Sequence, residues 1–395
     1  MCATQKPRLE RPNPTLDLGT SVLPGLDFPT FPSLWTKCIK VAISSQTHHG
    51  EGLHLRTSGH NQTLSDLGEA RIIRLVQEKG PTGLASHIRK GIGDDCAVLE
   101  AGGERCLLVT TDTLIQGIHF TDQTLPPEAL GWKALAVNMS DIAAMGGTPR
   151  TAFLSMGLKP ESRISFLESF MAGFKALADE SAIVLAGGDT VESPSFIAIT
   201  VMLLGDCPPE NVVYRSGARV GDDLWVTGPL GNAAGGLFLL REGLPSEASE
   251  YASLIQAHQR PAPRLGVGIA LGESGLVHAM IDISDGIAKD LGHICEQSHT
   301  GALLQATSIP MSDDLLGLAA DVKQSPLDWA LHGGEDYELL FTASSSDREK
   351  IVSLITKVSG SPPTKIGAII KEDGIWLEGV TGRNRLQSGG YVHFS

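Results

Sequence analysis

The sequence has no long apolar segment, only 5% aromatic residues and no excess of positive charge. Its most apolar stretch, Phe196–Leu204, is far shorter than the ~20 residues of a membrane-spanning helix, so we expect no membrane partner. Acidic residues outnumber basic ones by 45 to 31, which argues against a general nucleic-acid binder. The six cysteines form no CxxC pair and no His/Cys cluster, so we expect a reduced, cytoplasmic protein without a zinc site.

The familiar phosphate-binding motifs are also missing. The sequence contains neither a GxxxxGK[ST] loop nor the HRD and DFG strings of protein kinases. The glycine-rich segment 228–236 follows an expected strand and opens an expected helix. Its backbone N–H groups could receive an anion, and close packing of the helix on a sheet explains the glycines equally well.

Residues 1–60 differ from the rest of the chain. They hold six prolines, carry a small excess of basic residues and show no sustained periodicity. We interpret them as a flexible extension, either a targeting peptide or the product of a start codon placed too far upstream. The prolines argue against a secretory signal because they interrupt any apolar core.

Beyond residue 60, short apolar runs alternate with helical segments, which is typical of α/β or α+β layering. Ser65 is expected to cap the first helix. The expected strands are Leu107–Thr111, Ile183–Ala186, Phe196–Leu204, Asp223–Thr227, Met280–Ile283 and Glu338–Phe341. The expected helices are Glu128–Met145, Ser162–Asp179, Ala233–Arg241, Ala262–Leu271 and Ile287–Glu296. Cys207-Pro208-Pro209 follows a long strand, so we expect two domains, 61–207 and 208–395.

Aspartates gather where the expected strands and turns end. The acidic and hydroxyl positions of this pattern are Asp95, Thr110, Thr111, Asp112, Asp141, Asp189, Asp282 and Asp285, and Asn138 shares a helix face with Asp141. A single such residue is more often a turn residue or a helix cap. Several carboxylates at the ends of buried strands repel one another unless cations hold them, and Mg²⁺ prefers carboxylates together with phosphates. Metal-dependent phosphate chemistry is therefore the leading interpretation.

Taken together, these strings resemble the thiamine-monophosphate kinase family from about Thr63 to the C-terminus. The resemblance is carried by GIGDDCAVL, TTDTLIQGIHF, ALAVNMSDIAAMGGTP, GGDT, RSGA, IDISDG and HGGEDYEL. It implies a two-domain fold like that of aminoimidazole-ribonucleotide synthetase, with N-terminal domains that pair in a homodimer. It also implies ATP- and Mg²⁺-dependent phosphorylation of thiamine monophosphate to thiamine diphosphate.

The resemblance assigns roles residue by residue. Several Mg²⁺ ions would be bound by Asp95, Thr110, Thr111, Asp112, Asp141, Asp189 and Asp282, with Asp285 for a further ion. ATP would be contacted by Gly188, Arg215 and Ser284. The thiamine part would be contacted by His119, Glu335 and Tyr391. Glu335 would oppose the fixed positive charge of the thiazolium, and Tyr391 would offer it an aromatic face.

The acceptor in such a reaction is itself a phosphate, so two anions must be brought together. Several Mg²⁺ ions that hold both would explain a site so rich in aspartate. We expect direct in-line transfer without a phosphoenzyme, since carboxylates bound to metal are poor nucleophiles. Asp94 is the most available carboxylate for the competing covalent route.

Two alternatives stay open. The first is another ATP-using enzyme of the same superfamily, such as selenophosphate synthetase, for which Cys38-Ile39-Lys40 is a superficial match to the expected Cys and Lys. The second is a non-catalytic ATP-binding module. The presence of every expected metal ligand argues against that module.

Overall fold

The described part of the chain begins with two short helices, α1 (Leu64–Leu67) and α2 (Glu69–Lys79). The computed structural model describes residues 63–81, 86–243, 250–380, 382–387, 389–391 and 393, all within the unit Asn61–Ser395. The expected extension 1–60 lies outside the described residues. The prediction that Ser65 caps the first helix is wrong. Thr63 is the cap, because its side chain accepts the N–H of Asp66 while the Asp66 carboxylate accepts the N–H of Thr63.

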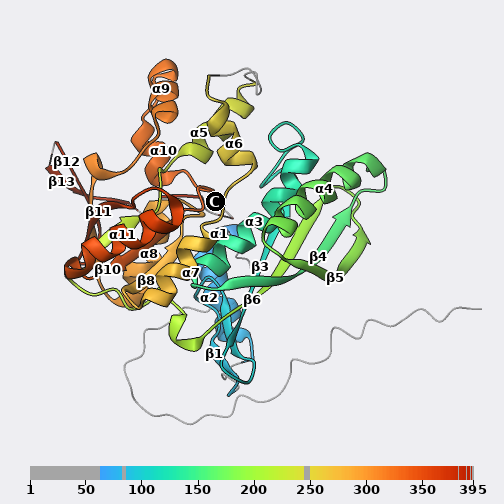
Figure 1. Ribbon diagram of the computed structural model, residues 1–395. Coiled ribbons are helices and arrows are strands. Elements are labelled where there is room, and N and C mark those ends of the chain that lie inside the picture. The colour runs from blue at the N-terminus through green and yellow to red at the C-terminus, as the bar shows by residue number, and fades with distance from the viewer. Residues whose placement is uncertain are drawn as a thin grey trace, which may run out of the picture. The chain divides into compact units, whose positions relative to one another are not determined.

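The first sheet is built entirely from residues before Pro208 (Figure 1). Its strand order is β1 (Ile88–Lys90), β2 (Ala97–Glu100), β3 (Cys106–Ile115), β6 (Ala198–Cys207), β4 (Thr148–Leu158) and β5 (Val184–Glu192). Neighbours run antiparallel except β4 and β5, which run parallel. The alternation of β3 turns Thr110, Asp112 and Leu114 toward one face of this sheet.

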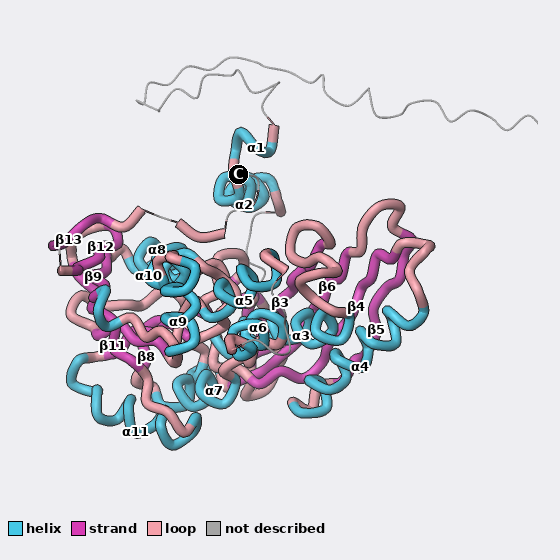
Figure 2. The backbone as a smooth tube through the Cα atoms, turned by 90° about the horizontal axis from the view of Figure 1, so that it is seen from above, coloured by secondary structure: helices cyan, strands magenta, loops and turns pink. Residues whose placement is uncertain are grey.

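Two helices, α3 (Pro127–Ala144) and α4 (Ile164–Glu180), pack together against this sheet (Figure 2). They approach closely because glycines lie at their contact. A Cβ on Gly131 would fall 1.9 Å from the carbonyl oxygen of Phe170, and one on Gly173 would fall 1.8 Å from that of Glu128. Helix α3 is apolar on most sides and almost wholly buried, which fits a helix enclosed between the first sheet and the second half of the chain.

The second sheet contains the strands after residue 220. Its order is β13 (Gly382–Arg385), β12 (Gly374–Gly379), β9 (Gly301–Gln305), β11 (Thr364–Ile370), β7 (Asp223–Val226), β10 (Leu339–Ala343) and β8 (Val277–Asp282). All described neighbours are antiparallel except β12 and β9. The buried strand β8 ends at Asp282, which brings that carboxylate to the edge of the core.

The helices of this second half form two groups. One packs with the sheet and contains α7 (Leu265–Ser274), α8 (Ile287–Ser298) and α11 (Arg348–Ser359). The other clusters separately and contains α5 (Asn232–Arg241), α6 (Ala252–Gln259), α9 (Asp313–Val322) and α10 (Pro326–His332). Within the described residues of this half, short 3₁₀ turns also lie at Pro209–Asn211, Ala306–Ser308 and Ser345–Asp347. The end of α3 joins α7, β8 and β10 in one hydrophobic cluster, so the two halves share a core.

Every strand and helix predicted beyond residue 100 overlaps an observed element, with ends shifted by a few residues. The predicted strand Ile183–Ala186 is longer than expected, because β5 continues through Gly187-Gly188-Asp189 to Glu192. Strand β4 was not expected. Its Pro149 lies beside a bulge in the pairing with β6. A proline within an apolar run argues against a strand when only the sequence is considered, although the residues after it alternate.

Among the helices of the described ranges, none has the length and apolar character to cross a membrane.

Candidate active site

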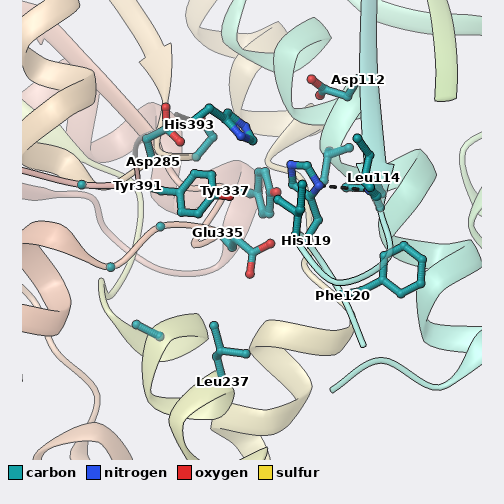
Figure 3. A pocket seen from close by; sticks show the side chains of 18 of the residues that line it. Asp112, Leu114, His119, Phe120, Leu237, Asp285, Glu335, Tyr337, Tyr391 and His393 are labelled. Carbon is teal, nitrogen blue, oxygen red and sulfur yellow. Dashed lines mark hydrogen bonds between the residues drawn. The ribbon is translucent and has the colours of Figure 1, made fainter. Parts of the chain in front are cut away.

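A large cleft of about 1370 Å³ lies where the two halves of the chain meet (Figure 3). Its walls come from β3 and the loop after it, from α5, from the turn after β8, from the segment 333–337, and from Gly390, Tyr391 and His393. Segments far apart in the sequence therefore supply one site. Most residues singled out from the sequence lie in this cleft or directly behind it.

Three aspartates form the deepest part of the site. One carboxylate oxygen each from Asp95, Asp141 and Asp282 lies within 4.8 Å of the others, in an arrangement that could hold a metal ion. They come from the turn before β2, from α3 and from the end of β8. All donors are carboxylate oxygens, which suits a hard divalent cation such as Mg²⁺ and does not suit zinc.

Hydroxyl groups orient two of these carboxylates, and an amide group holds the backbone of nearby Asp112. Thr110 donates its hydroxyl to Asp141. Ser140, which is fully buried, donates its hydroxyl to Asp282 over 2.6 Å. Asn138 accepts the backbone N–H of Asp112 over 3.1 Å, so the predicted shared face of Asn138 and Asp141 is confirmed. These bonds leave further lone pairs on each carboxylate for a cation.

Burial and mutual repulsion raise the pKa values of Asp112, Asp141 and Asp282. Burial, with Asp285 and Asp95 nearby, raises the pKa of Asp112 to about 6. Burial and Asp95 raise the pKa of Asp282 to about 8. The pKa of Asp141 is raised well above its ordinary value, first by burial and then by Asp112. A bound cation would remove this penalty, because it favours the ionised form of each carboxylate.

Arg215 closes one side of the cluster. Its guanidinium donates to Asp95 over 2.6 Å, and its backbone N–H donates to Asp94 over 3.1 Å. Asp94 also pairs with Lys90 at 3.1 Å and has no exposed side-chain surface. Asp94, the expected candidate for a covalent route, is therefore already held by two partners behind the cleft.

The turn after β8 carries Ser284 and Asp285 into the cleft. Asp290 at the start of α8 holds this turn, because its carboxylate accepts the N–H groups of Asp285 (3.1 Å) and Gly286 (3.0 Å). Asp285 itself pairs with Lys289 at 2.7 Å. The turn thus presents its carboxylate in a defined place with a cation beside it.

Glu335 lies in another part of the same cleft and has its own positive partner. Its Oε1 is 2.7 Å from Nζ of Lys133, and its Oε2 is 3.0 Å from Nδ1 of His258. Burial alone would raise the pKa of Glu335, but Lys133 and His258 outweigh it and lower that pKa to about 2. Glu335 adopts a left-handed backbone conformation (φ +67°), and its N–H donates to the carbonyl oxygen of Ser284. The carboxylate is therefore ionised and tied on several sides.

Aromatic rings border Glu335 in the cleft (Figure 3). The rings of His119 and Tyr391 are 6.3 Å apart, and that of His393 lies 5.2 Å from His119 and 4.8 Å from Tyr391. His119 is oriented by its Nδ1, which accepts the N–H of Ile115 over 3.0 Å. Tyr391 is tied by its backbone to Asp285 and Lys289. Two of the residues expected to contact thiamine thus lie side by side.

Gly188 and Asp189 do not lie in the cleft. They belong to β5, the edge strand of the first sheet, and every residue of β5 is exposed. Across the sheet, Asp112 of β3 pairs with Val201 of β6, Val201 pairs with Leu154 of β4, and Leu154 pairs with Gly188 of β5. Three strand spacings of ~4.8 Å place β5 about 14 Å from β3. The structure therefore does not bring Asp189 to the three-aspartate cluster.

The start of helix α5 holds an anion from the protein itself. The N–H groups of Gly231 and Ala233 donate to the carboxylate of Asp336 over 2.6 and 3.2 Å. The group that these N–H groups receive is thus a side chain of the protein, and the helix packs closely on α6 rather than on a sheet, since a Cβ on Gly236 would fall 2.0 Å from the carbonyl oxygen of Leu254. Thr111 borders the cleft, but its exposed side chain lies on the opposite face of β3 from Thr110.

Several residues of the site were missed in the sequence. Lys133, Ser140, His258 and Asp290 are buried and support the side chains in the cleft. Lys133 had a usable signal, since it is the one basic residue of a largely apolar helix and buried charges need partners. His258 had none, because its partners Lys133 and Glu335 are distant in sequence. Asp290 had a local signal, since it follows Asp285 and Gly286 by five and four residues at the start of a helix. Cys38-Ile39-Lys40 lies outside the described residues.

Comparison with known proteins places this site in a family context. Residues 93–207 match the family model of the AIR synthase related protein N-terminal domain, and residues 219–378 match that of the corresponding C-terminal domain. The described fold is therefore a two-domain fold of this type, as predicted. Whether the boundary lies at 207 stays a prediction.

Curated relatives cover most of the chain. A thiamine-monophosphate kinase of Salmonella typhimurium is 38% identical over 317 residues, which are 78% of this chain and 93% of the relative. A thiamine-monophosphate kinase of Aquifex aeolicus is 34% identical over 332 residues, which are 84% of this chain and 99% of the relative. A solved structure described as AaThiL complexed with AMPPCP and TMP superposes with a TM-score of 0.75 at 32% identity, covering 85% of this chain and 99% of that one.

Proposed function

Since the chain belongs to the thiamine-monophosphate kinase family and is a kinase, we propose that it transfers the γ-phosphate of ATP to thiamine monophosphate and forms thiamine diphosphate. The observation that supports this most is the cluster of Asp95, Asp141 and Asp282. A phosphate acceptor and a phosphate donor repel each other, and a pocket of buried carboxylates collects the cations that overcome this repulsion.

Magnesium ions would be held by the carboxylates at the base of the cleft. The proposed ligands are Asp95, Thr110, Asp112, Asp141, Asp282 and Asp285, with Thr111 at the border. Bound there, Mg²⁺ would neutralise charge on both phosphates and align them. The chain itself supplies the orientation, since Ser140 holds the side chain of Asp282 and Asn138 holds the backbone of Asp112 before any substrate arrives.

Arg215 and Ser284 are the proposed ATP contacts in the cleft. A guanidinium can hold a phosphate through two parallel hydrogen bonds, and the contact of Arg215 with Asp95 keeps it beside the metal ligands. Gly188 and Asp189 would contact the nucleotide, or a cation on it, from β5 at the edge of the sheet. They are the part of the proposed site that most needs a direct test.

Thiamine would lie near His119, Glu335 and Tyr391. The two rings offer apolar faces, and Glu335 offers carboxylate oxygens that remain partly exposed. The proposed domains are 61–207 and 208–395 after the extension 1–60, and the proposed compartment is the cytoplasm. We also propose a homodimer through the first sheet, because the edge strand β5 exposes Val184 and Val191 by 63% and 53%.

Transfer is proposed to be direct. Asp94 is held by Lys90 and by the backbone of Arg215, so the carboxylate that seemed most available for a phosphoenzyme is not free to attack. ATP made chiral at the γ-phosphate would test this, since one transfer inverts the configuration and two restore it. Retention would contradict direct transfer.

The function is tested with labelled ATP and magnesium, with thiamine monophosphate, aminoimidazole precursors and selenide offered in parallel. We expect label only in thiamine diphosphate. Transfer driven by selenide or an aminoimidazole precursor would favour another enzyme of the superfamily. Nucleotide binding without transfer to any acceptor would favour a binding module.

A further inference from the structure

Lys133 is a buried cation that the proposed chemistry does not use. Its side chain is 1% exposed, although it lies on α3 in an otherwise apolar stretch. Its Nζ lies 2.7 Å from Oε1 of Glu335 and donates to the carbonyl oxygen of His258 over 3.0 Å. That carbonyl belongs to the last turn of α6, where the partial negative charge of a helix end also favours a cation. Lys133 thus links α3, α6 and the Glu335 loop.

The contact with Lys133 changes what Glu335 can offer a ligand. A lone carboxylate would act as a counter-ion for the thiazolium ring. Here the charge is already balanced by an ammonium group at close range, so the pair has no net charge. The carboxylate still has about four lone-pair positions, and Lys133 and His258 approach one on each oxygen. A quarter of the Glu335 side chain remains exposed to the cleft.

We propose that Lys133 is a positioning residue that holds Glu335 as an oriented hydrogen-bond acceptor for the pyrimidine amine of thiamine monophosphate, rather than as a counter-ion for its thiazolium ring. This inference rests on the proposed function. Away from its phosphate, thiamine monophosphate has a single N–H or O–H donor group, the exocyclic amine of the pyrimidine. An acceptor held in one orientation distinguishes such a donor strongly, because a mismatched ligand leaves the buried acceptor unpaired.

Other charged and titratable groups face Glu335 from each neighbouring element. Lys133 belongs to α3 and His258 to α6, and Arg241 at the end of α5 influences His258. His119 follows β3, and Tyr391 belongs to the C-terminal segment. On its own loop, Asp336 and Tyr337 are the neighbours. Lys133 is the strongest of the favourable partners, so its removal should return the proton affinity of Glu335 toward that of a buried, unpaired carboxyl.

The first test compares Lys133→Met with the wild type by steady-state kinetics between pH 6 and 9. We expect the KM for thiamine monophosphate to rise at least tenfold at pH 6.5 and to return to within about threefold of the wild-type value at pH 9, where Glu335 ionises without help. The KM for ATP and kcat should change less than threefold. Glu335→Gln should raise the same KM at every pH, because its side chain does not titrate.

The matched control is Lys175→Met, which removes an exposed lysine paired with Asp179 on α4. It should leave all three parameters unchanged. A folded Lys133→Met enzyme with a wild-type KM across this pH range would overturn the inference, and so would a raised KM that does not recover at high pH.

The second test needs no variant and therefore does not depend on folding. The wild-type enzyme is given the analogue in which oxygen replaces the pyrimidine amine, which keeps the thiazolium cation and the phosphate. We expect kcat/KM to fall at least tenfold. Equal use of both substrates would overturn the inference while leaving the proposed function intact, whereas no turnover of thiamine monophosphate itself would reject the proposed function first.

Discussion

Two groups of buried carboxylates share one cleft and behave oppositely. In the acidic cluster, neighbouring aspartates and burial raise the pKa of Asp282 to about 8. In another part of the cleft, burial also raises the pKa of Glu335, but Lys133 and His258 outweigh burial and lower that pKa to about 2. Both are carboxylates enclosed in the cleft, with Asp282 2% and the Glu335 side chain 25% exposed, and the main difference is the charge of their neighbours. The several carboxylates of the cluster have only the guanidinium of Arg215, which pairs with Asp95, so they need further cations from outside the protein, whereas Glu335 has an ammonium partner of its own.

This difference separates the tasks of the site. A group that lacks its cation is suited to collect metal ions and, through them, phosphates. A group whose charge is already balanced cannot attract a cation strongly, but it can align a hydrogen-bond donor. Removing a charge from the acidic cluster should therefore have other consequences than removing one from the Lys133–Glu335 pair. Four measurements test this difference.

The largest effect is expected from Asp112→Asn. Its amide cannot supply the negative charge that Mg²⁺ prefers, so kcat should fall by at least about 10³-fold at saturating Mg²⁺. Circular dichroism and thermal melting should show an intact fold, and Asp179→Asn on the surface of α4 serves as the control. Glu335→Gln should act mainly on the KM for thiamine monophosphate. Comparable turnover of Asp112→Asn and the wild type would remove Asp112 from the metal ligands.

The second effect concerns stability without metal. Lys133→Met leaves Glu335 buried without its charge partner and should lower the free energy of unfolding by about 3 kcal/mol. Asp282→Asn removes one of several repelling carboxyls and should raise it by about 1 kcal/mol. Urea denaturation in EDTA at pH 7 measures both. Destabilisation of similar size in the two variants would show that the two groups do not differ as described.

The third effect is a pH dependence that magnesium cancels. In the folded state Asp112 and Asp282 have pKa values of about 6 and 8, above their ordinary value of 3.8. Their contribution to stability is complete below pH 3.8 and is lost as the pH rises through 6 and 8. In EDTA, the melting temperature should therefore fall by several degrees from pH 5 to pH 9.

Magnesium should flatten this profile, because it binds the ionised carboxylates of the folded state. Glu335 contributes in the opposite direction, since its lowered pKa adds stability that is lost only as the pH falls from about 4.5 toward 2. It therefore does not affect the window from pH 5 to pH 9. If the melting temperature fell equally from pH 5 to pH 9 with EDTA and with magnesium, the proposed metal ligands would be contradicted.

The smallest effect is expected from deletion of residues 1–60. Both carboxylate groups lie within the unit Asn61–Ser395, so neither should respond. Activity should stay within about twofold, and the melting temperature should stay within about 1 °C. A loss of several degrees would show that the extension contacts the catalytic unit.

Much of this site was accessible from the sequence because its ligands follow local patterns. Thr110 and Asp112 alternate along one strand, Asn138 and Asp141 share a helix face, and Asp282 ends an apolar strand. Such spacings are set by the geometry of a single element, so they can be recognised before the tertiary structure is known. The two-domain fold was reached in the same way, together with the family resemblance.

The partners of those residues depend on contacts between elements. Ser140 and Asp282 are 142 residues apart, and Lys133 and His258 are 125 residues apart, yet each pair is in direct contact. The expectation that Glu335 presents a free negative charge is where this matters most, because nothing near Glu335 in the sequence reveals its ammonium partner. The same holds for the start of α5, where Asp336 occupies the place left open for a ligand.

The sequence by itself determined which side chains could bind metal and phosphate, since strand and helix periodicity and turn chemistry are local. The tertiary structure alone decided which carboxylates remain without a cation and which already have one. Charge balance in a low-dielectric interior depends on distances of a few ångströms between side chains, and those distances arise only when α3, α6, β8 and the Glu335 loop pack together.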